Sequence, residues 1–529
     1  MKRFLMVLIV LLTVAFVVAG CAQPTAPAAP TAPKTAATTP AATTPQPKYG
    51  GTMRWIESQG PTTPIGYPPE IAGPSGVTPA IALQVLLKEY LDGSIGPNLA
   101  SSYQVNTSKD NPSITFNLQK GVKFHDGTDF NAQAVKWNYE EIKKTPAAAS
   151  NTNNWKSIDV IDDFTLRITL KEWQNTNIRA FADSWGYMAS PSAFQKNGLD
   201  WARYNIVGTG PFMQTSFQRD VTLTATKNPN YWEKGKPYLD KFEYLFVTDE
   251  MTRVAQFKSG AADVVNLNYN GRLANELKAA GYNIATQMGG PQVLLPDSTN
   301  ADSPWSNLKV RQAAEYAIDK ESIASAFGFG YWKAAYQFST PNSKAYDPTI
   351  PARKYDVAKA KQLMAEAGFP NGFKTTILAG PLFLYRDTVL AIQSQLAAIG
   401  IQTDVQFPDM AKWTEISGNP WKGALLYSNI SESGNQNKSF RYFVGVPAVR
   451  WKSVIRPEGF GEMLSVSEAT PEQDPVMLKK IAKVISDNVM CIPVYSGSIL
   501  WAFDKKVQDH GAGTRGQSNW YEPQNIWFK

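Results

Sequence analysis

Residue types that carry covalent or metal chemistry are scarce in this sequence. The 529 residues include two cysteines, Cys21 and Cys491, and two histidines, His125 and His510. No cysteine or histidine pair has the spacing of a zinc site, and neither histidine lies in a recognisable nucleophile motif. These absences count against a histidine-based hydrolase, a metal site, a bound cofactor and a disulfide framework. We therefore do not expect an enzyme.

Clustered positive charge and long apolar runs are also scarce beyond the first twenty residues. Charged residues make up 18% of the chain, the net charge is +7, and the basic residues are scattered along the sequence. A nucleic-acid site needs a clustered basic face, so we expect none. No later stretch approaches the roughly 20 apolar residues of a membrane span. With 43% hydrophobic residues, the body is expected to be soluble and to bury a core.

The long apolar run at the N-terminus has the pattern of an export signal. Two basic residues precede an apolar stretch at 4–18, and Val-Ala-Gly-Cys21 ends it. This tetrapeptide resembles the bacterial lipobox, in which the cysteine is acylated and becomes the new N-terminus. We expect residues 1–20 to be a signal peptide and Cys21 to carry a lipid that holds the protein at the outer side of the cell membrane. An uncleaved anchor, or an ordinary signal with a chance cysteine, is the alternative.

The segment after Cys21 has the composition of a tether. Residues 22–47 are almost wholly alanine, proline and threonine, which offer too little apolar surface to fold and favour extended polyproline II. At about 3.1 Å per residue, such a stretch can reach roughly 80 Å from the membrane. We assign 21–48 to the tether and 49–529 to the folded body, whose size predicts two or three domains.

Hydrophobic periodicity changes along the body. Alternation predicts strands in the first part, and an amphipathic pattern predicts a helix at 80–91. The predicted strands there are 52–57, 113–119, 164–170, 221–226, 242–247 and 261–267. Helices then alternate with strands, the helices at 308–318, 356–367, 386–399 and 474–488 and the strands at 375–379, 401–406 and 424–426. This alternation predicts α/β lobes.

Two motifs near the middle of the first part have structural and functional interpretations. His125 lies in the turn His-Asp-Gly-Thr at 125–128, before a helix that Asn131 is placed to cap. A single histidine in a turn is more often structural than catalytic. The Gly-Thr-Gly sequence at 208–210 lacks the Lys-Ser/Thr ending of a phosphate loop, so we interpret it as a turn.

Several motifs follow one another along the body in a characteristic order. They are YGGT at 49–52, FNLQKGVKFHDGT at 116–128, VGTGPF at 207–212, NPNYW at 228–232, VRQA at 310–313, YAIDK at 316–320, EAGFP at 366–370 and IPVY at 492–495. Together they resemble family 5 of the bacterial extracellular solute-binding proteins, the oligopeptide, dipeptide and nickel class that serves ABC importers. The resemblance spans the whole body.

That resemblance implies a fold and a mechanism. It implies an α/β, two-lobed fold of the periplasmic-binding-protein type with an extra subdomain in lobe one and a hinge between the lobes. Lobe one would comprise 49–262 and 497–529, and lobe two 263–496. A small solute would bind in the cleft, and the closed form would dock on an ABC permease. We expect the receptor to act as a monomer.

The family also implies where peptide recognition would lie, and this sequence departs from it. In peptide-binding members, a Trp and an Asp follow a strand of lobe two, and the Asp pairs with the peptide's amino group. In the matching stretch, 424–431, Ser428 stands in place of the Trp and Ser431 in place of the Asp. Tyr427, Ser428 and Asn429 are still candidates for ligand contact, and Glu432 is one residue beyond.

Further candidates lie at strand ends that the fold should direct at the cleft. They are Trp55, Glu57, Trp185, Tyr187, Asn268, Tyr269 and Gln337. Each has an alternative interpretation as ordinary core or surface. Aromatic rings stack on sugars and peptides, and the amides of Asn266 and Asn268 suit amide-rich or polyhydroxylated solutes.

The ligand class is left open by these residues. A peptide is favoured by the family's habits, and an oligosaccharide fits the Trp and Asn content. Two histidines offer few ligands for a bare nickel ion. The alternative of another class is a surface sensor or adhesion protein that keeps the fold without serving a transporter.

Overall fold

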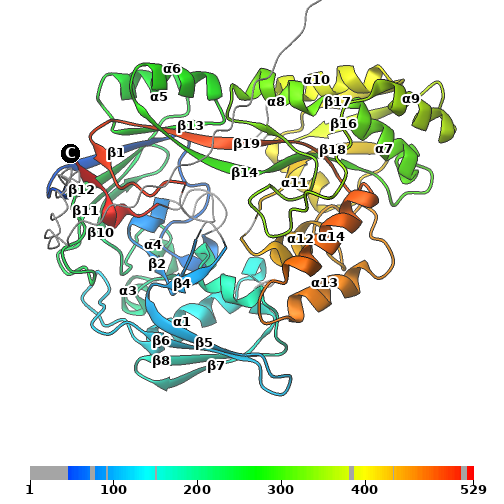
Figure 1. Cartoon of the computed structure of the whole chain (residues 1–529). Coiled ribbons are helices and arrows are strands. Elements are labelled where there is room, and N and C mark those ends of the chain that lie inside the picture. Colours follow the sequence, from blue (N-terminus) through cyan, green and yellow to red (C-terminus); the bar gives the residue numbers. More distant parts are fainter. Residues whose placement is uncertain are drawn as a thin grey trace, which may run out of the picture. The chain divides into compact units, whose positions relative to one another are not determined.

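The computed structural model describes residues 46–71, 78–90, 93–148, 152–380, 386–432, 434–513 and 521–529. One compact unit spans Pro47–Lys529 (Figure 1). The predicted signal peptide, Cys21 and nearly all of the predicted tether lie outside the described residues. Within the described ranges, no helix is both long enough and apolar enough to cross a membrane.

One large sheet organises the folded unit. Its eleven described strands have the order β10-β11-β12-β1-β13-β19-β14-β18-β16-β17, with β15 paired to β19. The bounds are β1 Thr52–Glu57, β10 Phe212–Gln218, β11 Thr222–Lys227, β12 Lys241–Phe246, β13 Val264–Asn268, β14 Asn283–Pro296, β15 Lys333–Ala334, β16 Phe373–Ala379, β17 Ile401–Gln406, β18 Ala424–Asn429 and β19 Ile492–Phe503. Most of the predicted strands are confirmed within a few residues.

Strands β14 and β19 join the two halves of this sheet (Figure 1). They pair antiparallel from Asn283 opposite Phe503 to Leu294 opposite Ile492. We call the half with β1 and β10–β13 lobe one, and the half with β16–β18 lobe two. The residue ranges given above for the lobes stay a prediction. Strand β13, which that prediction assigns to lobe two, pairs with β1 in lobe one.

Helices cover both faces of the lobe-two strands. Because successive side chains of a strand point to opposite faces, Leu294 packs in one core and its neighbours Val293 and Leu295 pack in another. The first core contains α7, α8, α9 and α10, and the second contains α12, α13 and α14. The helix bounds are α7 Leu308–Ala317, α8 Lys320–Gly328, α9 Val357–Glu366, α10 Arg386–Ala397, α11 Met410–Gly418, α12 Gln436–Val444, α13 Phe460–Ala469 and α14 Pro475–Asp487.

Lobe one has a similar layered core. Trp55 of β1 packs in one core with the aromatic side chains of β12, while its neighbour Ile56 faces a second core beneath α5 and α6. The helices of lobe one are α1 Ala132–Lys143, α3 Pro191–Asn197, α4 Leu199–Ala202, α5 Glu250–Lys258 and α6 Gly271–Ala279, with 3-10 turns η1 Pro68–Glu70, η3 Thr78–Ile81, η4 Pro146–Ala148, η5 Asn177–Phe181 and η6 Ser184–Gly186.

A four-stranded antiparallel sheet forms a subdomain of lobe one. Its order is β5-β6-β8-β7, with bounds β5 Ala100–Asn106, β6 Ser113–Leu118, β7 Trp155–Asp162 and β8 Thr165–Leu170. Helix α1 packs on it, and Asn131 caps this helix by accepting from the Ala134 amide at 3.0 Å, as the sequence predicts. Gly127, in the preceding turn, has φ +84°.

His125 has a structural role in this subdomain. Its Nε2 lies 3.0 Å from the Gly210 carbonyl oxygen, and its Nδ1 accepts from the Gly208 amide at 3.3 Å. Burial lowers the pKa of the imidazole, which favours this neutral form. A Cβ at Gly208 would lie 2.1 Å from the Ala82 carbonyl oxygen, so the 208–210 turn is packed against backbone and leaves no room for a phosphate.

The predicted helix at 80–91 is wrong. Its residues form the end of η3 and two short strands, β2 Gln84–Val85 and β3 Leu87–Glu89, which pair with β9 Tyr187–Met188 and β4 Ile95–Pro97. Nearly every apolar residue of this stretch is buried, so its apolar pattern does not mark a single helical face. The remaining short elements are β20 Val507–Gln508, β21 Trp527–Phe528, η7 Pro304–Ser306 and η8 Pro523–Asn525.

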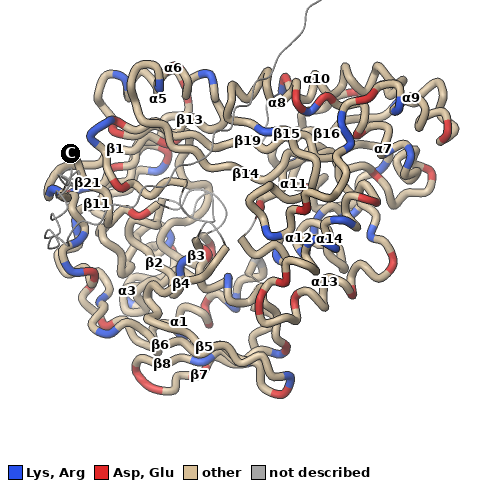
Figure 2. Tube along the Cα trace, in the orientation of Figure 1, with Lys and Arg blue, Asp and Glu red and all other residues tan. Residues whose placement is uncertain are grey.

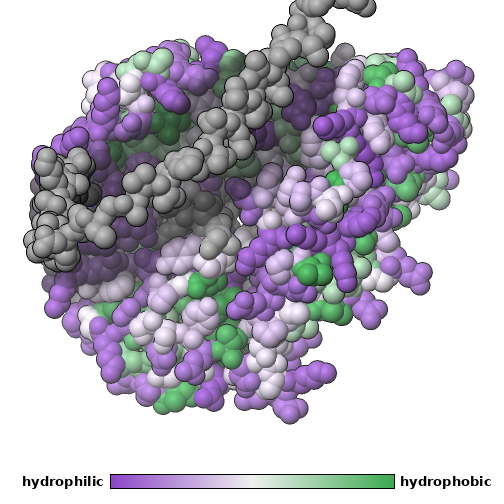
Figure 3. All heavy atoms as spheres, in the orientation of Figure 1, coloured by the Kyte–Doolittle hydropathy of each residue, from purple (hydrophilic) through white to green (hydrophobic). Residues whose placement is uncertain are grey.

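The surface is polar and its charges are mixed. Lys and Arg are interspersed with Asp and Glu along the trace (Figure 2). On the face drawn in Figure 3, hydrophilic side chains predominate and hydrophobic ones form small separate patches.

Candidate functional site

The carboxyl ends of three parallel strands place an acidic side chain among polar neighbours. Strand β1 pairs in parallel with β12 and with β13, so Glu57 and Asn268 end neighbouring strands at the same edge. In α/β sheets, ligands bind in the crevice outside the carboxyl ends of parallel strands. This edge is therefore the first candidate for the lobe-one wall of a binding cleft.

The carboxylate of Glu57 is held by two neutral donors. Trp55 Nε1 donates to Oε1 at 2.7 Å, and Asn266 Nδ2 donates to Oε2 at 2.6 Å. Burial, the largest effect, raises the pKa of Glu57 to about 7. The nearby guanidinium of Arg253 donates instead to the carbonyl oxygens of Val247 and Thr248, at 2.9 and 2.6 Å. A cationic group beside Glu57 would therefore stabilise the ionised form of its carboxyl group.

Asn268 has an unusual backbone conformation at this same edge of the sheet. Its backbone is left-handed, with φ +51°, and its amide donates to Asn266 Oδ1 at 2.7 Å. Ser58 Oγ donates to Asn268 Oδ1 at 3.4 Å. Strand β13 therefore ends in a kink that turns the chain toward Tyr269, which lies among the connecting strands.

An aromatic group lies beside the strands that join the lobes, around closely packed glycines. Trp332 stacks on Tyr495 with ring centroids 4.3 Å apart and planes 2° from parallel. A Cβ at Gly497 would lie 3.1 Å from the Tyr269 ring, so glycine lets this ring lie against the strand. The pairing of β14 with β19 is irregular between Met288 and Pro291, beside these rings. Asn266 bonds both Glu57 and the backbone of Asn268, and Tyr269 follows directly in the chain. Residues 266–269 thus connect Glu57 to these aromatic side chains.

The lobe-two candidates are placed differently. Tyr427 is fully buried in the core beneath α7–α10, while Ser428 and Asn429 are half-buried at the end of β18. Glu432 is not available as a substitute for the missing aspartate. Its carboxylate accepts from the Thr340 amide and hydroxyl, at 3.1 and 2.5 Å, and burial raises its pKa.

Three further candidates pack or bond elsewhere in the structure. Trp185 packs on the subdomain core, and Tyr187 is fully buried in the lobe-one core. The amide of Gln337 bridges to Asp347, donating to its carbonyl oxygen at 2.7 Å and accepting from its amide at 3.1 Å. It therefore organises the 337–347 loop.

A small cavity lies beside Tyr521, whose ring centroid is 4.8 Å from that of Trp55. Its volume is about 50 Å³, and its polar lining includes Gln84, Lys88 and Asn98. Such a volume holds a few water molecules. No group of three or more His, Cys, Asp or Glu able to hold a metal ion occurs among the described residues.

Sequence reasoning did not identify Trp332, Tyr495 or Tyr521 as neighbours of the candidate edge. Tyr495 was noted only as part of the IPVY motif, and for Trp332 and Tyr521 the sequence offers no signal beyond the residue type. Asn266 had been noted only as a general amide donor, and its bond to Glu57 spans 209 positions.

Comparisons with known proteins identify the relatives of this chain. Residues 94–445 match the model of the bacterial extracellular solute-binding proteins, family 5 Middle. The chain is 32% identical over 369 residues to the glutathione-binding protein GsiB of Salmonella choleraesuis, covering 66% of this chain and 70% of that protein.

Solved structures share the fold. The periplasmic binding protein DppA of Helicobacter pylori in complex with the peptide STSA has a TM-score of 0.75 at 21% identity, covering 91% of this chain and 98% of that one. NikA of Brucella suis in complex with Fe(III)-EDTA has a TM-score of 0.79 at 18% identity, covering 90% and 100%. Proteins of one fold therefore hold unlike ligands, and local chemistry decides among them.

Proposed function

The chain belongs to family 5 of the bacterial extracellular solute-binding proteins, and on that premise we propose that it captures a short peptide for an ABC importer. It is a binding protein of the importer class, and binding needs no covalent chemistry. The peptide would bind between the lobes, and closure would bury it through a higher affinity of the closed form for ligand. Lipid attachment at Cys21 and action as a monomer are parts of the same proposal.

The observation that carries the peptide proposal is the setting of Glu57. A carboxylate with neutral donors, at the carboxyl edge of parallel strands, complements an ammonium group, and the adjacent amides of Asn266 and Asn268 complement peptide groups. Glu57 would then take the role that the aspartate of peptide-binding relatives has in lobe two, where this chain has Ser431. The similarity to a glutathione-binding protein supports a small, amide-containing ligand.

A thermal-shift screen of the purified protein tests this function. The arms are glutathione, tri- to pentapeptides, the same peptides with acetylated amino ends, oligosaccharides and metal chelates. A ligand at 100 times its dissociation constant adds about 2.7 kcal/mol to stability. We expect free-amino peptides to raise the melting temperature and acetylated ones to do so less. A shift with oligosaccharides alone would contradict the peptide proposal.

Glu57→Gln is expected to alter how stability depends on pH. The carboxyl keeps its proton to about pH 7 in the folded protein, against a reference pKa of 4.5. Between these values the folded state binds the proton more tightly than the unfolded state, so wild-type stability falls as pH rises through this window. Glutamine is never ionised, so the variant lacks this fall, and between pH 4 and pH 8 its stability should rise relative to that of wild type by about 1–3 kcal/mol.

Urea unfolding at pH 4, 6 and 8 measures this difference. Glu366→Gln is the control, because Glu366 is exposed and its pKa is lowered by Lys309, which gives the opposite sign. Parallel stability profiles for wild type and Glu57→Gln would show that Glu57 is not in a desolvated setting.

A further inference from the structure

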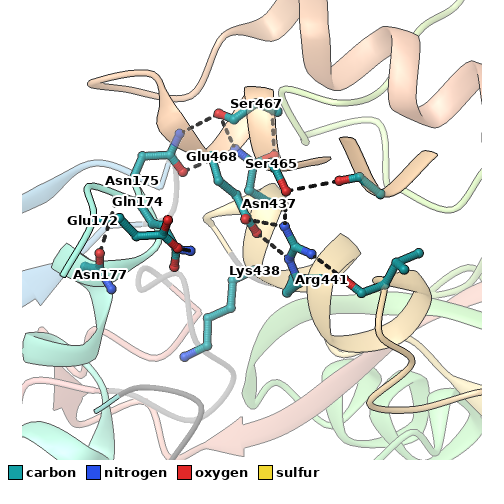
Figure 4. Close-up of polar contacts among 12 residues, drawn as sticks. Glu172, Gln174, Asn175, Asn177, Asn437, Lys438, Arg441, Ser465, Ser467 and Glu468 are labelled. Atoms are coloured by element: carbon teal, nitrogen blue, oxygen red, sulfur yellow. Dashed lines mark hydrogen bonds and ion pairs between the residues drawn. The ribbon is translucent and has the colours of Figure 1, made fainter. Parts of the chain in front are cut away.

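One loop asparagine of lobe one is buried entirely in contacts with lobe two. Asn175 lies between β8 and η5 and is 3% exposed. Its backbone amide donates to the Glu468 carbonyl oxygen at 2.8 Å. Its side-chain Nδ2 donates to the Ser467 carbonyl oxygen at 2.9 Å (Figure 4). The same Nδ2 donates to Thr470 Oγ1 at 3.2 Å. The acceptors lie at the carboxyl end of α13, where helix carbonyl groups have no partner within the helix.

The remaining polar groups of Asn175 are bound by the first turn of α12. Asn435 Nδ2 donates to the Asn175 carbonyl oxygen at 2.9 Å, and Asn437 Nδ2 donates to Asn175 Oδ1 at 3.2 Å. Every backbone and side-chain polar group of Asn175 is thus bonded across the lobes. A residue with a role only in its own lobe would not be bonded in this way.

We call the lobe-two residues that bond Asn175 its socket; they are Asn435, Asn437, Ser467, Glu468 and Thr470. Bonds within lobe two hold this socket together. Ser467 Oγ donates to Asn437 Oδ1 at 2.8 Å, and Asn437 Nδ2 donates to the Ser467 carbonyl oxygen at 3.1 Å. Arg441 of α12 forms an ion pair with Glu468 of α13, with Nε 2.9 Å from Oε1 (Figure 4). Because these bonds do not involve lobe one, the socket is expected to keep its shape when the lobes separate.

Two more polar contacts join the lobes near this socket. Trp173 Nε1 donates to the Thr470 carbonyl oxygen at 2.9 Å. Lys438 Nζ lies 3.2 Å from Asp183 Oδ2. Both involve the same segment of lobe one and the same pair of helices, so the contacts form one patch.

A glycine pair brings the two backbones together at the edge of this patch. A Cβ added at Gly434 of lobe two would lie 2.6 Å from Glu89 Oε1 and 2.7 Å from Gly93 Cα, both in lobe one. The φ of Gly434 is not left-handed, so alanine would not be strained within lobe two itself. An alanine there would conflict with this arrangement of the lobes and not with the fold of either lobe.

We propose that Asn175 and its socket form a latch between the lobes, which stabilises the closed form by the same amount whatever ligand is bound. The latch consists of protein groups alone, so its contribution to the free energy of closure does not depend on ligand chemistry. Ligand chemistry is recognised separately, at the site near Glu57. A closed form stabilised in this way raises the affinity for every ligand by a common factor. The consequence for affinity rests on the proposed function, whereas the latch itself does not.

The test compares Asn175→Ala and Gly434→Ala with wild type and with Gln174→Ala. Gln174 adjoins Asn175, but its side chain donates to Glu172 within lobe one, at 2.8 Å. Small-angle scattering reports the separation of the lobes, and hydrogen exchange of the residue 175 amide reports its bond to Glu468. Both latch variants should scatter as a more open molecule and exchange this amide at least about tenfold faster, as expected when several hydrogen bonds are lost. Gln174→Ala should match wild type.

Gly434→Ala is the sharper variant, because it leaves every bond donor and acceptor of the Asn175 socket in place. Faster exchange at residue 175 in this variant would have to come from separation of the lobes. If its circular dichroism shows that it does not fold, Asn175→Ala decides the question. Wild-type scattering and exchange in the folded variants, or an unprotected residue 175 amide in wild type, would overturn the latch.

Binding of glutathione to the same variants separates the latch from the proposed function. Titration calorimetry should show a loss of affinity of about tenfold for both latch variants and none for Gln174→Ala. If wild type does not bind glutathione, that result counts against the ligand class, and scattering and exchange still decide the latch. If glutathione binds equally to all variants, the latch is overturned.

Discussion

Glu315→Gln is expected to destabilise the protein by about 3–5 kcal/mol, because it leaves a buried ammonium without its counter-ion. Glu315 is 2% exposed, and its Oε1 lies 3.0 Å from the Nζ of Lys320, whose side chain is fully buried. Its other oxygen accepts from Arg353 at 2.9 Å. Burial already lowers the pKa of Lys320, so the charged form depends on Glu315. Chemical denaturation at neutral pH measures the loss.

Two variants establish the cause of this loss. Glu366→Gln removes an exposed partner of Lys309 and should cost less than about 1 kcal/mol. The double change Glu315→Leu with Lys320→Met removes the fully buried ion pair, leaves Arg353 with 14% of its side chain exposed, and should recover part of the stability. Equal losses for Glu315→Gln and Glu366→Gln would contradict the buried-charge explanation.

Gly290→Ala is expected to have a comparably large effect, through the strands that join the lobes. A Cβ at this position would lie 2.1 Å from the carbonyl oxygen of Ile430, a contact that requires the backbone to move. The residue lies where the pairing of β14 with β19 is already irregular. We expect a loss of stability of about 3 kcal/mol and a reduced affinity for peptide, because the displaced strand β14 pairs with β19, which carries Tyr495 of the aromatic group.

The neighbouring glycine provides a matched control. A Cβ at Gly289 would lie 3.3 Å from the Gly497 carbonyl oxygen, a tight contact that small shifts relieve. Gly289→Ala should therefore cost much less than Gly290→Ala in urea unfolding. Equal effects of the two substitutions would show that backbone flexibility at this crossing, and not the contact with Ile430, is the limiting factor.

Local pattern predicted most of the elements well. Helix α14 confirms the helix predicted at 474–488, with Leu478, Ile481 and Ile485 buried on it, and Asn131 caps α1 as predicted. The stretch at 80–91 was misassigned because its strands depend on partners elsewhere in the chain, such as Tyr187 opposite Val85. Periodicity describes one segment, and it does not identify the segment that pairs with it.

The sequence by itself determined the family, through motifs that recur in order along the body, and with the family it determined the two-lobed fold and the receptor class. It also placed Glu57 at a strand end. Only the tertiary structure joined Glu57 to Asn266 and enclosed Asn175 in a socket that includes the carbonyl oxygen of Ser467, 292 positions away. Residue order encodes propensity and periodicity over a few turns of chain. Contacts between lobes depend on how whole sheets and helices pack, and that packing decided which polar side chains of this protein meet.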